Sequence, residues 1–150
     1  MQDNIYATNH TSFTVADMDR AVALFCDGLG FELISRAGRD PASIRTITGV
    51  AGAEVDIAYL RRPDHVVELI EYKAPDDRKD PALRPCDTGF AHLAFDVRDI
   101  DAAIAHLAAY HAEPISPPYV NKVGGPNAGA RISYLSTPDR VTIELIQRPS

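Results

Sequence analysis

One stretch of the chain occurs twice, and this repeat limits the fold more than any other feature. Residues 10–25 read HTSFTVADMDRAVALF, and residues 92–107 read HLAFDVRDIDAAIAHL. The coinciding positions include His10 and His92, Phe13 and Phe95, Val15 and Val97, and Asp17 and Asp99, each pair 82 residues apart. Because polar and apolar positions are preserved together, the repeat indicates two copies of one structural unit.

A second pair of segments ends the two copies. Residues 57–70 read IAYLRRPDHVVELI, and residues 132–146 read ISYLSTPDRVTIELI. Both contain Glu-Leu-Ile near the end, so that Glu68 and Glu144 are equivalent positions. Each copy therefore begins near a histidine and ends near a glutamate, and His10, Glu68, His92 and Glu144 form two equivalent pairs.

Hydrophobic periodicity and turn residues predict the order βαβββ in each copy. The expected elements of the first copy are strand 5–15, helix 17–28, strand 31–37, short helix 40–48, and a hairpin of strands 54–61 and 66–72. In the second copy they are strand 90–97, helix 100–110, and strands 115–122, 131–136 and 141–147. The proline-rich, charged segment 73–88 is the predicted connector. The sequence thus predicts one α+β domain, 1–150, built from two tandem βαβββ modules, 5–72 and 89–147.

Strand alternation predicts where the histidines and glutamates point. His92 lies on the face opposite Leu93 and Phe95, and Glu144 lies opposite Ile143 and Leu145. We expect the large apolar residues to pack under the helices, which leaves the histidines and glutamates on the other, concave face of each sheet.

Composition narrows the choice of partners. The 150 residues carry a net charge of −6 and a pI near 5.2, and the 15 Lys and Arg residues are scattered. Nucleic acid and anionic membranes both require clustered basic residues, so neither is an expected partner. No apolar run approaches the roughly 20 residues of a membrane span, and no secretion signal is recognisable, so a cytoplasmic location is expected.

Two imidazoles and two carboxylates suit one divalent ion, with Ni, Co, Mn, Zn and Fe(II) all compatible. In an octahedral site, four protein ligands leave two positions that two adjacent oxygens of a small substrate could fill. Such an ion acidifies a C–H next to a carbonyl, and Glu144 or Glu68 could then act as the general base. The alternative for each residue taken singly is a hydrogen-bonded histidine or a solvated glutamate.

From residue 5 to residue 147 the chain resembles the vicinal oxygen chelate superfamily, which includes glyoxalase I, methylmalonyl-CoA epimerase, extradiol dioxygenases and bleomycin or fosfomycin resistance proteins. The motifs that carry the resemblance are NHTSFTVADMDRAVALFCDGLGF, HVVELIEY, GFAHLAFDVRDID and YLSTPDRVTIELIQ. The resemblance implies paired βαβββ modules that form an incomplete barrel around a metal ion, and it implies a homodimer, in which the metal site lies either within one chain or between the two chains.

The resemblance leaves three functions open. Glyoxalase-like lyases and epimerase-like isomerases take ligands from the positions of His10, Glu68, His92 and Glu144, whereas Fe(II) extradiol dioxygenases use a triad that would be His10, His92 and Glu144. Glu68 therefore favours proton transfer over oxygen activation. A non-enzymatic, drug-sequestering resistance protein is the third alternative; four intact ligands and the absence of Trp speak against it.

Weaker signals concern single residues near the expected site. Asp56 resembles the second catalytic carboxylate of the epimerases, although a solvated strand residue is the stronger interpretation. Tyr59 and Tyr134 are repeat partners, which favours symmetric core packing. The Gly-rich segment 123–130 is interpreted as a loop near the cavity mouth, with Asn127 as a candidate substrate contact.

Two further expectations concern basic residues. The final turn reads Pro138-Asp139-Arg140 where the family commonly has Pro-Asp-Gly, so Arg140 is expected to take a positive φ. If glutathione were part of the substrate, its carboxylates would need basic partners. The available residues are Arg36, Arg39, Lys122 and Arg131.

Overall fold

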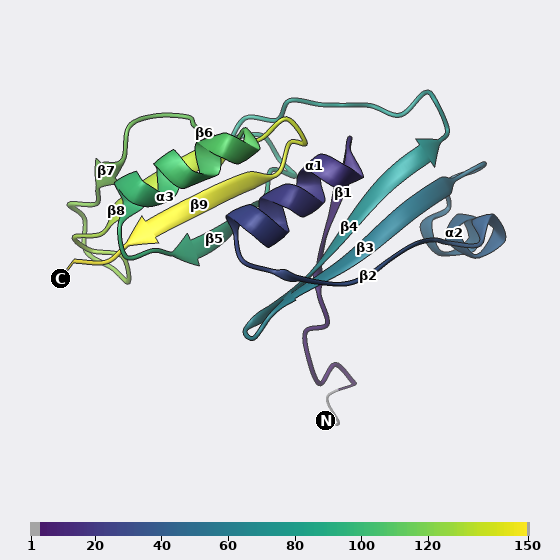
Figure 1. The fold of residues 1–150 in the computed structure, drawn as a ribbon, viewed down its shortest axis with the longest axis horizontal. Coiled ribbons are helices and arrows are strands. Elements are labelled where there is room, and N and C mark those ends of the chain that lie inside the picture. Colours follow the sequence, from purple (N-terminus) through teal and green to yellow (C-terminus); the bar gives the residue numbers. More distant parts are fainter. Residues whose placement is uncertain (1–3, 150) are drawn as a thin grey trace. The chain divides into compact units, whose positions relative to one another are not determined.

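The computed structural model describes residues 4–149 and divides into two compact units, residues 1–76 and 77–150. The sheet of the first unit has the strand order β1 (Thr11–Val15), β4 (His65–Ala74), β3 (Glu54–Arg62), β2 (Glu32–Gly38). β1 is parallel to β4, and the other neighbours are antiparallel. Between β1 and β2 lies α1 (Met18–Ala23), continued by the π-helical turn η1 (Leu24–Gly28); α2 (Pro41–Thr48) joins β2 to β3 (Figure 1).

The second unit repeats this plan. Its sheet has the order β5 (His92–Asp96), β9 (Thr142–Gln147), β8 (Arg131–Ser136), β6 (Glu113–Pro114), and β7 (Tyr119–Val120) also pairs with β8. The helix after β5 is α3 (Ile100–Leu107), extended by the 3-10 turn η2 (Ala108–Tyr110) (Figure 1). The α+β class and the two βαβββ modules are therefore confirmed.

Two strand predictions were too long. Of the expected strand 115–122, only β7 (Tyr119–Val120) is formed, and the other short piece, β6, lies just before it at Glu113–Pro114; prolines at 114, 117 and 118 have no N–H to donate to a ladder. The first strand begins at Thr11 instead of residue 5. Thr11 pairs with Val67 of the neighbouring strand β4, which itself begins only two residues earlier, at His65. The hydrogen-bonded ladder between β1 and β4 therefore ends near Thr11.

The helix-facing side of the first sheet forms a core around Phe25. Phe25 is fully buried, and its ring centre lies 5.4 Å from that of Phe31 and 6.2 Å from that of Phe13. Leu60 and Leu69, on the two central strands, are also fully buried. The alternation expected along β1 is confirmed, since Val15 is buried and Ser12 is exposed.

The repeat extends to the way each helix begins. The side chain of Asp17 accepts a hydrogen bond from the Arg20 N–H, and Asp99 accepts one from Ala102, both at 3.0 Å. A side chain of the last strand of each unit then accepts from the first helical N–H. Glu71 accepts from Met18 at 3.2 Å, and Gln147 accepts from Ile100 at 3.0 Å. Both helices are thus held to their sheets at the N-terminus, where four N–H groups have no partner within the helix.

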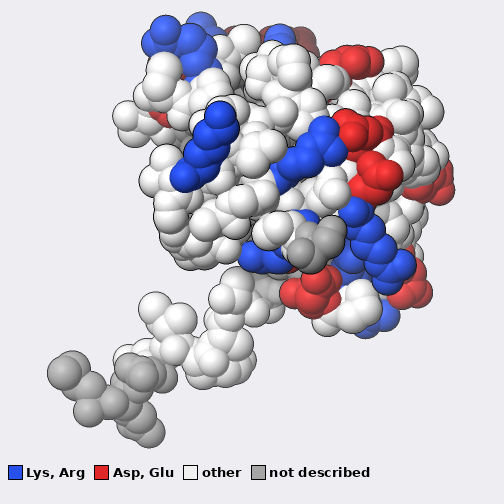
Figure 2. Space-filling model, turned by 90° about the vertical axis from the view of Figure 1, so that its left-hand side faces the viewer, with Lys and Arg blue, Asp and Glu red and all other residues white. Residues whose placement is uncertain are grey.

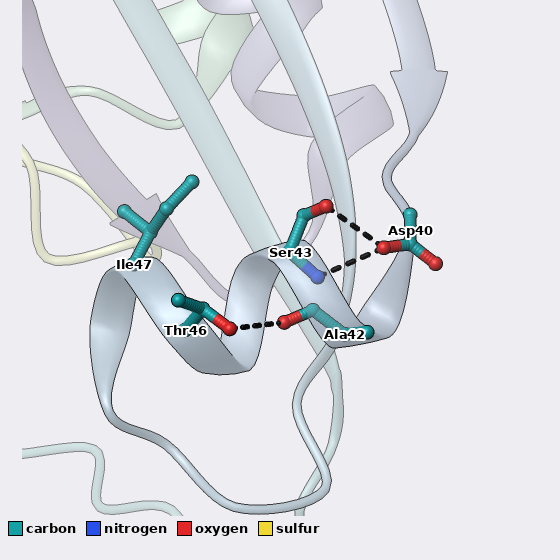
Figure 3. Close-up of a pocket in the computed structure, with 5 residues that line it drawn as sticks. All are labelled: Asp40, Ala42, Ser43, Thr46 and Ile47. Atoms are coloured by element: carbon teal, nitrogen blue, oxygen red, sulfur yellow. Dashed lines mark hydrogen bonds between the residues drawn. The ribbon is translucent and has the colours of Figure 1, made fainter.

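Helix α2 begins with its own cap. The Asp40 carboxylate accepts hydrogen bonds from the N–H and the hydroxyl of Ser43, both at 2.8 Å, and Thr46 donates to the Ala42 carbonyl (Figure 3). Pro41 occupies the first turn, where its missing N–H costs nothing.

We expect Asp40→Ala to lower the Tm more at pH 7 than near pH 2. The bonds from Ser43 lower the pKa of the Asp40 carboxyl below 3.8. A lowered pKa means that this contribution to stability is present above about pH 4 and is lost as the pH falls through the folded-state pKa. Thermal melts across this range measure it. Asp77→Ala, at an exposed carboxylate of the connector, is the control. An equal loss of Tm for Asp40→Ala at both pH values would contradict the role of the ionised Asp40 side chain as the helix cap.

The turn between β8 and β9 confirms the expectation for Arg140. Its φ is +62°, in the left-handed region that favours glycine, and its N–H donates to the Thr137 carbonyl at 3.1 Å. The guanidinium donates to both oxygens of Asp80, at 3.0 and 3.2 Å. The connector thus contributes a partner for this turn within the second unit.

No helix within residues 4–149 is long and apolar enough to cross a membrane.

Candidate metal centre

The first unit brings His10 and Glu68 together. His10 directly precedes β1, and its Nε2 lies 3.3 Å from Oε2 of Glu68 on β4. Its other ring nitrogen, Nδ1, lies 2.6 Å from Oδ1 of Asn9, which fixes the orientation of the ring. The Glu68 side chain is 11% exposed and that of His10 is 29% exposed. The carboxylate is therefore sheltered, whereas the imidazole is reachable from solvent.

The second unit forms the same pair from His92 and Glu144. Nε2 of His92, the first residue of β5, lies 3.1 Å from Oε2 of Glu144 on β9. The exposed fractions are 36% for the histidine side chain and 13% for the glutamate side chain, close to those of the first unit. The ring of Tyr134 lies 4.9 Å from that of His92, centre to centre.

Strand register explains why the two pairs match. Ser12 pairs with Glu68 across β1 and β4, and Ala94 pairs with Glu144 across β5 and β9. Each histidine lies two residues before the strand position that faces the glutamate. Because side chains alternate along a strand, positions two apart share a face, and the histidine side chain reaches the glutamate.

Within either unit, no third His, Cys, Asp or Glu of the described residues joins the pair to form a potential metal-binding group. The donor spacing nevertheless fits a metal ion. Two donors at right angles, each about 2.1 Å from one ion, lie about 3.0 Å apart, close to the 3.3 and 3.1 Å found here. Each unit therefore offers two adjacent ligand positions of nitrogen and carboxylate type.

The two tyrosines do more than the predicted core packing. Tyr59 pairs with Glu68 across β3 and β4, and its hydroxyl donates to Glu68 Oε1. This bond, burial and the nearby carboxylate raise the pKa of Tyr59. Tyr134 pairs with Glu144 in the same way; burial and the negative charge of Glu144 raise its pKa. The sequence signal that could have indicated these roles is the position of each tyrosine directly across a hairpin from a glutamate.

Asp56 lies away from the candidate site. It is three residues before Tyr59 on β3, so the two side chains point to opposite faces of the sheet. Its Oδ2 accepts a hydrogen bond from Arg36 Nε at 2.8 Å, and Arg36 also bonds to Asp19 on α1. Asp56 therefore joins the helix to the helix-facing side of the sheet, and the resemblance to a second catalytic carboxylate does not hold.

A cavity of about 460 Å³ lies beside Glu144 in the second unit. Its lining comes from β8, β9, β7 and the chain around them: Pro85, Ile115, Ser116, Tyr119, Asn121, Ile132, Ser133, Tyr134 and Glu144. Most of these residues were not identified from the sequence, and the exposure of Ile115 and Tyr119 becomes apparent only in the structure.

The Gly-rich segment 123–130 is a loop, as expected, but its candidate contact Asn127 lies outside the cavity lining. The Asn127 carbonyl accepts a hydrogen bond from the Asn121 amide at 3.0 Å. Asn121 also bonds through its backbone to Ala130 and Gly129, and its side-chain oxygen accepts from Val123. The loop is thus held by bonds within itself, with Asn121 as its organising residue.

Three of the four basic residues considered for binding carboxylates are engaged elsewhere. Arg36 holds two aspartates, Arg39 donates to the Ala37 and Gly38 carbonyls, and Arg131 forms a two-bond pair with Asp101 at 2.7 and 3.0 Å. That pair raises the pKa of Arg131. Figure 2 shows basic side chains spread among acidic and uncharged ones on the face it displays.

The sequence profile of the Glyoxalase/Bleomycin resistance protein/Dioxygenase superfamily matches residues 7–145. With two βαβββ modules that each pair a histidine with a glutamate, the chain belongs to this superfamily, also called the vicinal oxygen chelate superfamily.

Relatives in the superfamily include an epimerase. The chain is 37% identical, over 148 residues, to a 2-epi-5-epi-valiolone epimerase from Actinomyces sp. This alignment covers 96% of this chain and 80% of that protein. A crystal structure of a glyoxalase family protein from Bacillus cereus is similar with a TM-score of 0.84 and 24% identity, covering 100% and 99% of the two chains.

A more distant solved structure contains a metal. The fosfomycin resistance protein of Listeria monocytogenes, in complex with Mn(II) and sulfate, has a TM-score of 0.61 and 15% identity, covering 97% of this chain and 94% of that one. At this identity the likeness concerns the fold.

Proposed function

We propose that this protein is a divalent-metal-dependent isomerase of epimerase type, with the related glyoxalase-type lyase reaction using the same site. The ligands of the ion are His10, Glu68, His92 and Glu144. The observation that carries this proposal is the pair of matched histidine–glutamate contacts at 3.3 and 3.1 Å. The 37% identical relative that is an epimerase supports the isomerase reaction.

The proposed chemistry begins with a substrate that carries two adjacent oxygens. A bound divalent ion supplies Lewis acidity, which makes the C–H next to a carbonyl easier to deprotonate. Glu144 would remove this proton as general base; water would then donate a proton to the opposite face of the carbon, and Glu144 would release its proton to solvent, which completes the epimerisation. His10 and His92 would hold the ion through their Nε2 atoms.

Glu68 favours this reaction over the dioxygenase alternative. A facial triad of His10, His92 and Glu144 would leave Glu68 without a role at the metal. Glu68 instead has the same histidine contact and the same strand register as Glu144, and its side chain is almost as sheltered. A four-ligand set is the simpler account of this symmetry.

The test combines metal analysis with solvent exchange. Protein purified without chelator or a His tag is expected to contain about one Ni, Co, Mn or Zn ion per chain, and chelation is expected to remove it. In D2O the reloaded protein is expected to place deuterium on the carbon beside the carbonyl of hydroxyacetone, followed by NMR. Preferential uptake of Fe(II) with O2 consumption on a catechol would favour the dioxygenase. Failure to take up any ion would overturn the proposal.

A further inference from the structure

The equivalent faces of the two sheets differ in what covers them. In the first unit, α2 lies over the face that carries Glu68, where its Ile44 joins a buried cluster with Val55 and Ile57. In the second unit, the described chain between β7 and β8 is a hydrogen-bonded loop without a helix. Ile57 is therefore 4% exposed, whereas its repeat partner Ile132 is only half-buried and lines the cavity beside Glu144.

The exposed face of the second sheet has a defined set of side chains. Tyr119 pairs with Ile132 across β7 and β8, and Tyr134 pairs with Glu144 across β8 and β9. Ile132 and Tyr134 are two residues apart on one strand, so all four side chains share the face. Two aromatic rings and an aliphatic side chain thus lie next to the carboxylate.

The polar groups of this cavity are hydroxyls. Tyr119, Tyr134 and Ser116 each offer a hydroxyl that can both donate and accept a hydrogen bond. The Asn121 amide is already bonded to its own loop, and the Ser133 hydroxyl lies 3.4 Å from the Ser116 carbonyl, which accepts from it. The cavity therefore combines aromatic surfaces with hydroxyl groups.

Positive charge is missing from the cavity. None of the described residues that line it is Lys or Arg, and Glu144 is its one carboxylic acid. Nearby arginines are already paired, Arg131 with Asp101 and Arg148 with Asp96. Away from the proposed metal ligand Glu144, a phosphate or carboxylate in the body of a substrate would find no basic side chain in the lining, and desolvating it without one is unfavourable.

We propose that this cavity holds the body of an uncharged, hydroxyl-bearing carbon ring, with its reactive carbon at Glu144. This inference rests on the proposed function and names its substrate class. The C–H faces of a saturated ring lie against Tyr119 and Tyr134, while its hydroxyls bond to the tyrosine and serine hydroxyls. Acyl-CoA and glutathione substrates, which carry phosphates or carboxylates, match this lining less well.

The test measures binding without turnover. The probe is scyllo-inosose, an uncharged ring ketone with a hydroxyl on each remaining carbon, added to chelator-treated protein and followed by saturation-transfer NMR. We expect binding to the wild type and a dissociation constant about 3–10-fold higher for Tyr119→Ala, because the aromatic surface is lost. Ile47→Ala, at a side chain of α2 that is 79% exposed, is the matched control and is expected to bind as the wild type does.

A second variant reverses the charge preference. Ser116 is exposed, so Ser116→Lys should fold normally while adding a cation to the cavity. We expect this variant to gain affinity for methylmalonyl-CoA, which the wild type binds more weakly than the inosose. Tighter binding of methylmalonyl-CoA than of the inosose by the wild type, or unchanged inosose binding by Tyr119→Ala, would overturn the inference.

The two proposals fail separately. Deuterium exchange into hydroxyacetone without inosose binding would overturn the substrate class and leave the proposed function standing. Inosose binding that depends on Tyr119, without metal uptake or deuterium exchange, would overturn the proposed function and leave the inferred binding cavity standing.

Discussion

Glu144→Gln is expected to lower kcat by about 10²–10⁴-fold at saturating metal, the usual contribution of a positioned general base. Glu144 lines the cavity where we place the substrate, and it has only a 13% exposed side chain. The amide keeps an oxygen that can bind the ion but cannot accept the substrate proton. The measurement is steady-state epimerisation with the metal content determined on the same sample.

Glu68→Gln is the matched comparison. Tyr59 donates a hydrogen bond to Glu68, and Glu68 is not among the residues that line the cavity. We expect its loss to weaken metal binding but to lower kcat far less once the metal is saturating. Asp56→Asn, on the opposite face of the first sheet, is expected to change neither quantity. Equal losses of kcat for both glutamine variants would mean that the two glutamates act only as ligands.

Phe25→Ala is expected to lower the free energy of unfolding by about 3–5 kcal/mol, the range for large aromatic residues truncated in a core. Phe25 is fully buried between Phe13 and Phe31 in the first unit. Removing its ring deletes buried apolar surface and leaves a cavity that neighbouring rings fill only in part. Urea unfolding followed by circular dichroism measures the change.

Ile47→Ala serves as the control for this prediction, because a side chain that is 79% exposed buries little surface to lose. We expect its effect to stay within about 0.5 kcal/mol. A loss below about 1 kcal/mol for Phe25→Ala would show that the ring does not contribute to the core as its burial indicates.

The repeat predicted most of the fold because it preserves positions that local physics uses. Asp17 and Asp99 coincide in the repeat, and each side chain accepts a hydrogen bond from the first turn of the helix that follows. The positive φ of Arg140 followed from the missing glycine in a turn of known type. The errors occurred where a strand needs a partner, as at Ile5, or lacks donors, as between Pro114 and Tyr119.

The sequence by itself gives each copy one histidine and one glutamate at equivalent strand positions. Strand alternation and the repeat are local properties, and they place His10 near Glu68 and His92 near Glu144 as soon as the strands pair.

Only the tertiary structure decided the surroundings of these pairs. It bonds Tyr59 to Glu68, turns Asp56 to the helix-facing side, covers one sheet face with α2 and leaves a cavity over the other. These outcomes depend on which elements distant in sequence pack on each face, and residue periodicity carries no information about that choice.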